Sequence, residues 1–286
     1  NTLQPSDFPF HQRTTPADVQ SSSIVRDSND RVGSQGVRLT EFVDIIVGSS
    51  VDSVTQVADP VFNVGGANTR RVTGRNTPTV INSIFNYTNF WDGRANFIFN
   101  GNNPFGPADN NSGVWFNDPA GLVKRPVSIQ FGSLASQATG PALDHTEMSA
   151  RGRTFPKLGR KMLSLTPLGK QLVHPGDSVL GTLSKAVLQP NGKYAGNGLN
   201  TTHAQMIRDA FQDNLWNGAT LTPDGFTQME ANFSLFWGLS IQMYVATLVS
   251  DQTPFDRWLA GNVNALTDQQ KLGFDVFDGI GGCNAC

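Results

Sequence analysis

Residues 267–286 read TDQQKLGFDVFDGIGGCNAC, and this stretch decides the fold. Thr267 and Gln270 have the three-residue spacing of a capping box, which predicts the start of a helix. Apolar residues at helical spacing follow, and a cluster of glycines then ends the helix. The only two cysteines of the chain, Cys283 and Cys286, come directly after these glycines. The stretch therefore predicts a short amphipathic helix that leads into a C-x-x-C pair.

A C-x-x-C pair has three chemical interpretations. When His follows it, both thiols attach to the porphyrin of a c-type haem and the imidazole ligates the iron. A redox dithiol usually stands near a βαβ pattern, which is missing around Cys283. A zinc site needs a second Cys or His pair, and the sequence has none. Haem attached at Cys283 and Cys286 is therefore the leading interpretation, with the expectation that His follows Cys286.

The composition is that of an exported, loop-rich protein. Charged residues make up only 15% of the chain, against about 25% in typical soluble domains, and Gly, Asn, Ser and Thr take their place. The net charge of −2 gives no reason to expect nucleic acid or an anionic membrane as a partner. A disulfide between two cysteines so close in sequence cannot stabilise a fold of this size, so the burial of apolar side chains must stabilise the core.

Helical patterns dominate from residue 76 onward. A Thr-Pro pair places an N-cap before a proline at the first helical position, and it predicts helix starts at Thr77, Thr166, Thr222 and Thr253. Residues 203–216 carry apolar side chains at helical spacing. Residues 226–249 predict the longest helix, and the polar residues within it favour a buried helix over a membrane span.

Three segments are expected to lack regular structure. Residues 1–35 are polar and show little periodicity. Residues 98–130 are rich in Asn, Gly and Pro, which predicts a long surface excursion. Residues 250–252 are polar and predict a linker between the long helix and the terminal segment.

A second informative stretch runs from Arg75 to Ala95. Residues 75–82 read RNTPTVIN and residues 89–95 read NFWDGRA. Taken alone, this is a capped helix followed by a turn with a buried Trp. The run resembles the R-N-x-P-T…F-W-D-G-R-A signature of the bacterial dihaem cytochrome c peroxidase and MauG superfamily. The match is long and specific, unlike a lone glycine motif.

Three further stretches resemble the family in the same order. Residues 137–148 are similar to its Q-x-x-G-P…E-M loop, residues 247–258 to its interdomain crossing, and residues 266–286 to the entry of its second haem domain. The resemblance spans roughly residues 70–286, with an insertion at about 96–130. It implies a mainly α fold of cytochrome c-like haem domains with long irregular loops.

The family carries two c-type haems, so the resemblance implies two in the full protein. One more C-x-x-C-H motif is then expected upstream of Asn1, and the chain would be the stretch between the two haem motifs. Residues 1–250 would belong to the first, peroxidatic haem domain. Residues 251–286 would begin the second, electron-transfer cytochrome c domain.

The resemblance implies three catalytic residues, and each has a plainer alternative. Trp91 would lie between the haems and assist electron transfer, or it is simply a core residue. Glu147 would sit over the open face of the first haem and move a proton between the two oxygens of peroxide, or it is a surface carboxylate. Gln137 would hydrogen-bond peroxide or an ordered water, or it is a polar cap.

Two more residues receive cofactor and metal roles from the resemblance. Arg94 would pair with a haem propionate or with Asp92, and the sequence leaves both open. Asn76 would give a side-chain oxygen to a calcium ion between the domains. Calcium needs about 6–8 oxygens, so one Asn is a small part of such a site.

The four histidines are expected to be structural or exposed, because none has the spacing of a metal-ligand pair: His11, His145, His174 and His203. His145 is the exception, since it lies two residues before Glu147 and could reach the same pocket. Peroxidases of the family often carry a loop His that caps the resting iron, whereas residues 12–75 contain no His. This departure predicts an open, five-coordinate first haem.

Three functions follow from the resemblance. The leading one is a periplasmic or secreted dihaem peroxidase that reduces hydrogen peroxide with electrons from a small cytochrome c or cupredoxin. The alternative is a MauG-like or oxygenase-type haem enzyme that oxidises a protein or organic substrate, with the 96–130 insertion shaping its site. A second alternative is a non-catalytic multihaem electron carrier. No nucleic acid partner and no membrane span are expected, and a homodimer is left open.

Overall fold

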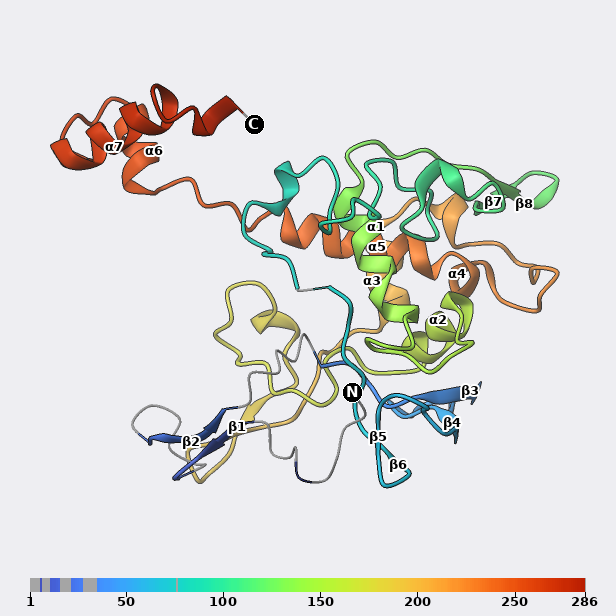
Figure 1. The fold of residues 1–286 in the computed structure, drawn as a ribbon. Helices are drawn as coiled ribbons and strands as arrows, with labels where there is room; N and C mark the ends of the chain where they lie inside the picture. The colour runs from blue at the N-terminus through green and yellow to red at the C-terminus, as the bar shows by residue number, and fades with distance from the viewer. Residues whose placement is uncertain (1–5, 7–10, 16–21, 28–34, 76, 286) are drawn as a thin grey trace.

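A computed structural model describes residues 6, 11–15, 22–27, 35–75 and 77–285. The α-helices of this part of the chain are α1 (Ser133–Thr139), α2 (Phe155–Leu163), α3 (His203–Ala210), α4 (Gln228–Ala231), α5 (Phe233–Val245), α6 (Pro254–Leu259) and α7 (Asp268–Asp278). Short 3-10 helices include η2 (Ser83–Phe85), η4 (Pro141–Leu143), η6 (Asp213–Leu215) and η7 (Cys283–Ala285). Long irregular loops connect these elements, as expected (Figure 1).

In the part of the chain that the structure describes, the strands pair as two-stranded antiparallel ribbons, which the mainly α prediction did not include. The pairs are β1 (His11–Arg13) with β2 (Ile24–Asp27), β3 (Thr40–Asp44) with β4 (Ser53–Gln56), β5 (Asn63–Val64) with β6 (Ala67–Asn68), β7 (Val114–Asp118) with β8 (Gly121–Arg125), and β9 (Val187–Leu188) with β10 (Tyr194–Ala195). The mainly α prediction therefore describes the fold in part, because the helices form most of the core but Val114 of β7 also belongs to it.

The core forms where α1 and α2 pack against α4 and α5. Phe99, Ala135, Phe233 and Phe236 are among its buried side chains. Gly238 lets α1 and α5 approach closely, because a Cβ there would lie 2.9 Å from the Phe99 ring and 3.1 Å from the Ala135 carbonyl oxygen. A glycine in the middle of a helix costs about 0.5–1 kcal/mol relative to alanine, and here the close packing offsets that cost.

The long helix predicted over 226–249 is broken at Asn232. This residue is almost fully buried, and its side chain accepts from the backbone N–H of Trp115 (2.8 Å) and donates to the carbonyls of Trp115 (2.7 Å) and Leu215 (2.8 Å). The Asn232 backbone lies outside the helical region, so it ends α4 and begins α5. The Asn232 side chain thus hydrogen-bonds backbone groups of β7 and interrupts a helix whose hydrophobic pattern is continuous.

The prediction of a surface excursion over 98–130 is wrong for several residues at its start and middle. Phe99, Asn100 and Val114 are buried, and Phe99 and Val114 belong to the main core cluster. The amide of Asn100 donates to Asn103 Oδ1 and to the Gly106 carbonyl, both at 2.9 Å. Asn side chains in this segment therefore replace regular backbone pairing and let an irregular chain pack inside the fold.

Three of the four predicted Thr-Pro helix starts are wrong, while Thr253 does cap α6. Thr166 and Thr222 begin turns. After Thr77 the chain forms only the short helix η2, because Asn82 has a left-handed φ of 61°. The Asn82 N–H donates to Leu248 O (2.9 Å) and its Oδ1 accepts from Ser250 N (2.7 Å), so contacts with a distant segment override the local signal.

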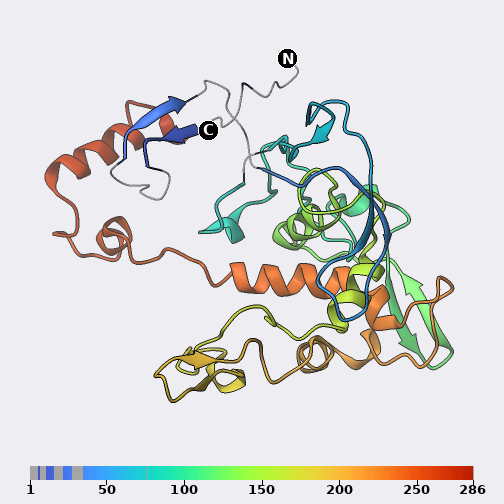
Figure 2. The ribbon, with the colours of Figure 1, turned by 90° about the horizontal axis from the view of Figure 1, so that it is seen from below.

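The terminal helices α6 and α7 stand apart from the helical body in both views (Figures 1 and 2), joined to it by the chain after α5. Both begin with capping boxes, at Thr253 with Asp256 and at Thr267 with Gln270, as predicted for Thr267. Phe255, Trp258 and Phe274 pack together between them. No helix in the described residues is both long and apolar enough to cross a membrane.

Candidate active site

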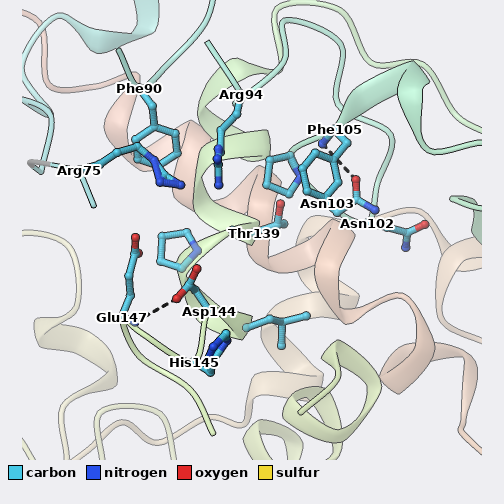
Figure 3. Close-up of a pocket in the computed structure, with 14 residues that line it drawn as sticks. Arg75, Phe90, Arg94, Asn102, Asn103, Phe105, Thr139, Asp144, His145 and Glu147 are labelled. Atoms are coloured by element: carbon cyan, nitrogen blue, oxygen red, sulfur yellow. Dashed lines mark hydrogen bonds between the residues drawn. The ribbon is translucent and has the colours of Figure 1, made fainter. Parts of the chain in front are cut away.

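A cavity of about 280 Å³ opens between the Arg75–Arg94 region, the insertion and the loop after α1. Its lining residues are Arg75, Phe90, Arg94, Asn102, Asn103, Pro104, Phe105, Thr139, Gly140, Pro141, Leu143, Asp144, His145 and Glu147. In Figure 3 the Glu147 side chain extends from one wall toward the guanidinium groups of Arg75 and Arg94 on the other. The cavity therefore combines a carboxylate and two cations in a partly enclosed space.

The loop after α1 positions Glu147. Asp144 stabilises its turn, since Asp144 Oδ1 accepts from the backbone N–H of Thr146 (2.7 Å) and Glu147 (3.2 Å). The Asp144 carbonyl accepts from the N–H groups of Met148 (3.0 Å) and Ser149 (2.9 Å). The Glu147 side chain enters the cavity, whereas the next residue, Met148, is exposed.

Burial, followed by the nearby negative charge of Asp144, raises the pKa of Glu147 above its usual value. The positive charges of Arg75 and Arg94 offset part of this effect. Glu147 is thus a carboxyl group that keeps its proton to a higher pH than an ordinary surface Glu does. This property suits a group that must both accept and return a proton.

The opposite wall is built by the loop from Asn89 to Ala95. Asn89 and Ala95 exchange two backbone hydrogen bonds (3.2 and 3.3 Å), and the buried Asn89 side chain donates to Ser133 Oγ at 3.2 Å. Phe90 has a left-handed φ of 64°, a conformation that bulky residues rarely adopt. This closed loop orients the Phe90 ring toward the cavity and leaves the Trp91 indole 83% exposed.

Of the two partners expected for Arg94, the structure contains Asp92. Arg94 Nε lies 3.1 Å from Asp92 Oδ2, and Arg75 Nε lies 3.8 Å from the same oxygen. Arg75 also stacks over the Phe90 ring, 5.2 Å from its centroid. Its buried Nε has no hydrogen-bond partner among the described atoms, so the guanidinium can still bind an anionic or polar group.

The three residues predicted as catalytic do not all line this cavity. Glu147 does, but Gln137 and Trp91 do not. Gln137 lies on α1, two residues before the lining residue Thr139, and its Oε1 is buried without a partner. Trp91 is exposed, so the alternative that it is a core residue is wrong.

The cysteine segment fits the attachment of a c-type haem. Cys283 is a free, exposed thiol that begins η7. Beside it, α7 buries none of its side chains, and the apolar Leu272, Phe277 and Ile280 are 63%, 50% and 94% exposed. The thiol could form a thioether bond to a porphyrin, and the exposed apolar side chains could pack against its ring. Cys286 lies outside the described residues.

The expected calcium ligand cannot be placed. Asn76 lies outside the described residues. Within the part of the chain that the structure describes, no group of three or more His, Cys, Asp or Glu side chains could hold a metal ion. Calcium therefore stays a prediction from the sequence.

Two of the histidines have structural contacts, as expected. His174 accepts from the Gly176 N–H at 3.0 Å, and a ring nitrogen of His203 lies 3.1 Å from Leu165 O. His145 lines the cavity, so the interpretation that it could reach the pocket of Glu147 is confirmed. The side chain of His11 lies outside the described part of the chain.

Sequence reasoning missed Arg75, Phe90 and Asp144 as residues of the site. Arg75 opens the R-N-x-P-T run, so its place at the head of a specific motif was a signal that could have identified it. The alternative function assigned the 96–130 insertion a part in shaping the site, but it did not single out residues 102–105, which form part of the wall.

The cavity and the cysteine segment are compatible with the resemblance to the dihaem cytochrome c peroxidase and MauG superfamily. Residues 52–172 match the family model described as Di-haem cytochrome c peroxidase, which confirms the resemblance predicted from the sequence. Haem c is accordingly the cofactor that the family implies.

Three characterised relatives agree with this family. The chain is 26% identical over 216 residues to the cytochrome c peroxidase Ccp of Escherichia coli, which is 76% of this chain and 26% of that protein. It is 27% identical over 212 residues to the cytochrome c551 peroxidase of Pseudomonas aeruginosa, which is 74% of this chain and 36% of that protein. A shorter stretch of 43 residues is 58% identical to the cytochrome-c peroxidase IdrP2 of Denitromonas iodatirespirans, covering 15% and 12% of the two chains. The chain thus spans little more than a third of these relatives at most.

Proposed function

We propose that the chain is the peroxidatic part of a dihaem cytochrome c peroxidase, which reduces hydrogen peroxide to water with electrons from a small cytochrome c or cupredoxin. The observation that carries this proposal is the Glu147 carboxylate facing Arg75 and Arg94 across the cavity. The names of the relatives, three cytochrome c peroxidases, support the same activity.

Glu147 is the proposed proton carrier of the reaction. Its carboxylate accepts a proton from one oxygen of peroxide and returns it to the oxygen that leaves as water. The raised pKa that burial gives Glu147 favours the first of these steps, because the carboxylate is a stronger base than an ordinary Glu. Haem, when bound, supplies the iron and the electrons that cleave the O–O bond. Overall, peroxide takes up two electrons and two protons and yields two molecules of water.

Gln137 and Trp91 have supporting roles in this proposal. The unpartnered Oε1 of Gln137 is an acceptor for an O–H of peroxide or of an ordered water. Trp91 is the proposed bridge for electrons from the second haem, since its exposed indole offers an easily oxidised group to a neighbouring domain. Trp91→Phe should then slow electron transfer between the haems without lowering the melting temperature. An unchanged transfer rate in stopped-flow spectra would exclude the bridge.

The proposed cellular setting is the periplasm or the exterior of the cell. The low share of charged residues and the abundance of Gly, Asn, Ser and Thr support export. Two haems c, one of them attached at Cys283 and Cys286, and a calcium ion bound with help from Asn76 complete the proposed holoprotein.

The decisive experiment uses the full-length, haem-loaded protein. We expect peroxide-dependent oxidation of a reduced small cytochrome or cupredoxin, and a loss of about 10²–10⁴-fold in kcat/KM in Glu147→Gln. The matched control is Asp251→Asn, which removes an exposed carboxylate outside the cavity and should leave kcat/KM unchanged. Absence of peroxide turnover with every donor, or full activity of Glu147→Gln, would refute the proposal. Two low-spin haems with no response to peroxide would instead indicate an electron carrier.

One observation favours a second candidate, the oxidation of an organic or protein substrate. The 96–130 insertion supplies Asn102, Asn103, Pro104 and Phe105 to the cavity wall, so it shapes the space in which a larger substrate would bind. Consumption of oxygen, or oxidation of an added substrate without an electron-donor protein, would support this function over peroxide reduction.

A further inference from the structure

The loop that carries Glu147 is held from outside by a segment distant in sequence, residues 36–42. The N–H of Val37 donates to the Thr146 carbonyl at 3.0 Å, directly before Glu147. Four residues after Glu147, Arg151 forms a bridge with the strand β3: its N–H donates to Thr40 O at 2.8 Å and its carbonyl accepts from Phe42 N at 2.9 Å. Both ends of the loop are therefore hydrogen-bonded to this one segment.

A charged pair reinforces the second of these contacts. The Arg151 guanidinium binds the Glu41 carboxylate through Nε, with a distance of 2.7 Å to Oε1, and through Nη2 to the same oxygen. The pair joins side chains that are 110 positions apart and lies next to the backbone bridge of the same two residues. The hydrogen bond to Arg151 lowers the pKa of Glu41, which keeps this carboxylate ionised.

Gly36 brings the segment closer to the loop than any other residue type would allow. A Cβ at this position would lie 1.6 Å from the Thr146 carbonyl oxygen and 3.2 Å from the Glu147 Cα. Gly36 cannot move away from the loop easily, because its N–H donates to Arg71 O (2.8 Å) and its carbonyl accepts from Arg70 Nη1 (3.2 Å). An added methyl group must therefore push on the loop itself.

We infer that Gly36 and the Glu41–Arg151 pair are positioning residues, which set how far the Glu147 carboxylate reaches into the cavity opposite Arg75 and Arg94. The segment 36–42 touches the loop but contributes no lining residue to the cavity, so it acts only through the loop. We call the contacts of residues 36–42 with the Glu147 loop the brace. A displacement of about 1 Å at a reacting group can lower the rate by about 100-fold, so the brace should affect turnover. This inference rests on the proposed function.

Displacement of Glu147 would also change its proton affinity. Asp144 and His145 share its loop, and Arg75 and Arg94 face it from the opposite wall. Because the charges of Asp144, Arg75 and Arg94 act on Glu147 in opposite directions, the balance depends on its distance from each. The acid limb of the pH–rate profile is therefore a readout that mere loss of folded protein would not move.

The test is a double-mutant cycle in the full-length, haem-loaded protein. Gly36→Ala should lower kcat/KM for peroxide by about 10- to 100-fold and shift the acid limb of the pH profile. In the Glu147→Gln background the same substitution should change kcat/KM by less than about 2-fold, because the group being positioned is gone. Gly74→Ala is the matched control, since a Cβ at Gly74 meets no atom within 4 Å and its backbone conformation is an ordinary one. An equal loss in both backgrounds, or no loss in either, would overturn the inference.

A second variant tests the inference without the risk that an added methyl group unfolds the protein. A second measurement tests it without relying on peroxide turnover. Glu41→Gln removes the exposed ion pair without adding atoms, and it should lower kcat/KM by about 2- to 5-fold in the wild-type background only. Amide hydrogen exchange of residues 144–151 should be faster in both variants, whether or not the protein turns over peroxide. Unchanged amide hydrogen exchange of residues 144–151 in both variants would show that residues 36–42 do not hold the loop. Faster exchange together with a fully active Glu147→Gln would instead refute the proposed function and leave the brace standing.

Discussion

At the scale of single residues, the raised pKa of Glu147 affects both catalysis and the pH dependence of folding stability. Burial and Asp144 raise its pKa, so the folded protein holds this proton more tightly than the unfolded chain does. Its contribution to stability is therefore fully present below the ordinary pKa of Glu and is lost as pH rises through the raised value.

Glu147→Gln should consequently be more stable than the wild type above that raised pKa, by on the order of 1–2 °C in melting temperature, and the gain should vanish at acid pH. Activity should change in the opposite sense: the wild type loses kcat/KM as pH falls through the same pKa, because the carboxylate is then protonated, and the variant should lack this limb. Calorimetry and steady-state kinetics between pH 4 and about pH 8 check both expectations. A variant less stable than the wild type at pH 7 would contradict the assigned direction of the pKa.

At the scale of elements, the junction of α4 and α5 depends on one buried side chain. Asn232 satisfies the N–H and the carbonyl of Trp115 on β7 and the carbonyl of Leu215 in η6, so it joins a ribbon, a 3-10 turn and two helices. Its removal takes this partner from the Trp115 N–H and the Leu215 carbonyl, while the Trp115 carbonyl keeps the hydrogen bond from Gln228 Nε2 (2.8 Å). A buried polar group left without a partner costs more than the hydrogen bond itself contributes.

Asn232→Ala should lower the free energy of unfolding by about 2–4 kcal/mol, measured by urea denaturation with an unchanged m-value. Asn110→Ala, an exposed Asn in the insertion, is the control and should change it by less than about 0.5 kcal/mol. Equal effects of the two substitutions would show that the junction does not depend on the Asn232 hydrogen bonds.

At the scale of the whole molecule, the terminal helix α7 has an exposed apolar surface that no other described part of the chain buries. The apolar side chains of α7 are exposed next to the free thiol of Cys283, and α6 and α7 stand apart from the helical body (Figure 2). Exposed apolar surface of this kind is costly in water, so a covalently attached macrocycle and its domain are the expected cover.

The full-length protein should contain two c-type haems per chain, counted by the pyridine haemochrome assay. Replacement of both Cys283 and Cys286 by Ala should reduce the count to one, because these substitutions remove only one of the two haem attachment sites that the proposal expects. A colourless wild-type protein, or an unchanged count in the double variant, would refute attachment at this segment.

The sequence alone determined the features that depend on neighbouring residues. The capping boxes at Thr253 and Thr267 form as their spacing requires, because both partners lie within one turn of the same helix. The motif that contains Trp91 and the spacing from Gln137 to Glu147 predicted the resemblance to the family, and the match of residues 52–172 to its model confirms that resemblance.

Only the tertiary structure decided the features that depend on distant contacts. Thr77 fails to start a full helical turn because Leu248 and Ser250 bind Asn82, and the 226–249 helix breaks because Asn232 bonds β7. In the same way, Arg75 faces Glu147, and Gly36 presses on its loop, only after segments separated by 70 or more residues have packed together. Such contacts outweigh local preferences because one buried hydrogen bond or close approach is worth as much as the propensity of a whole helical turn.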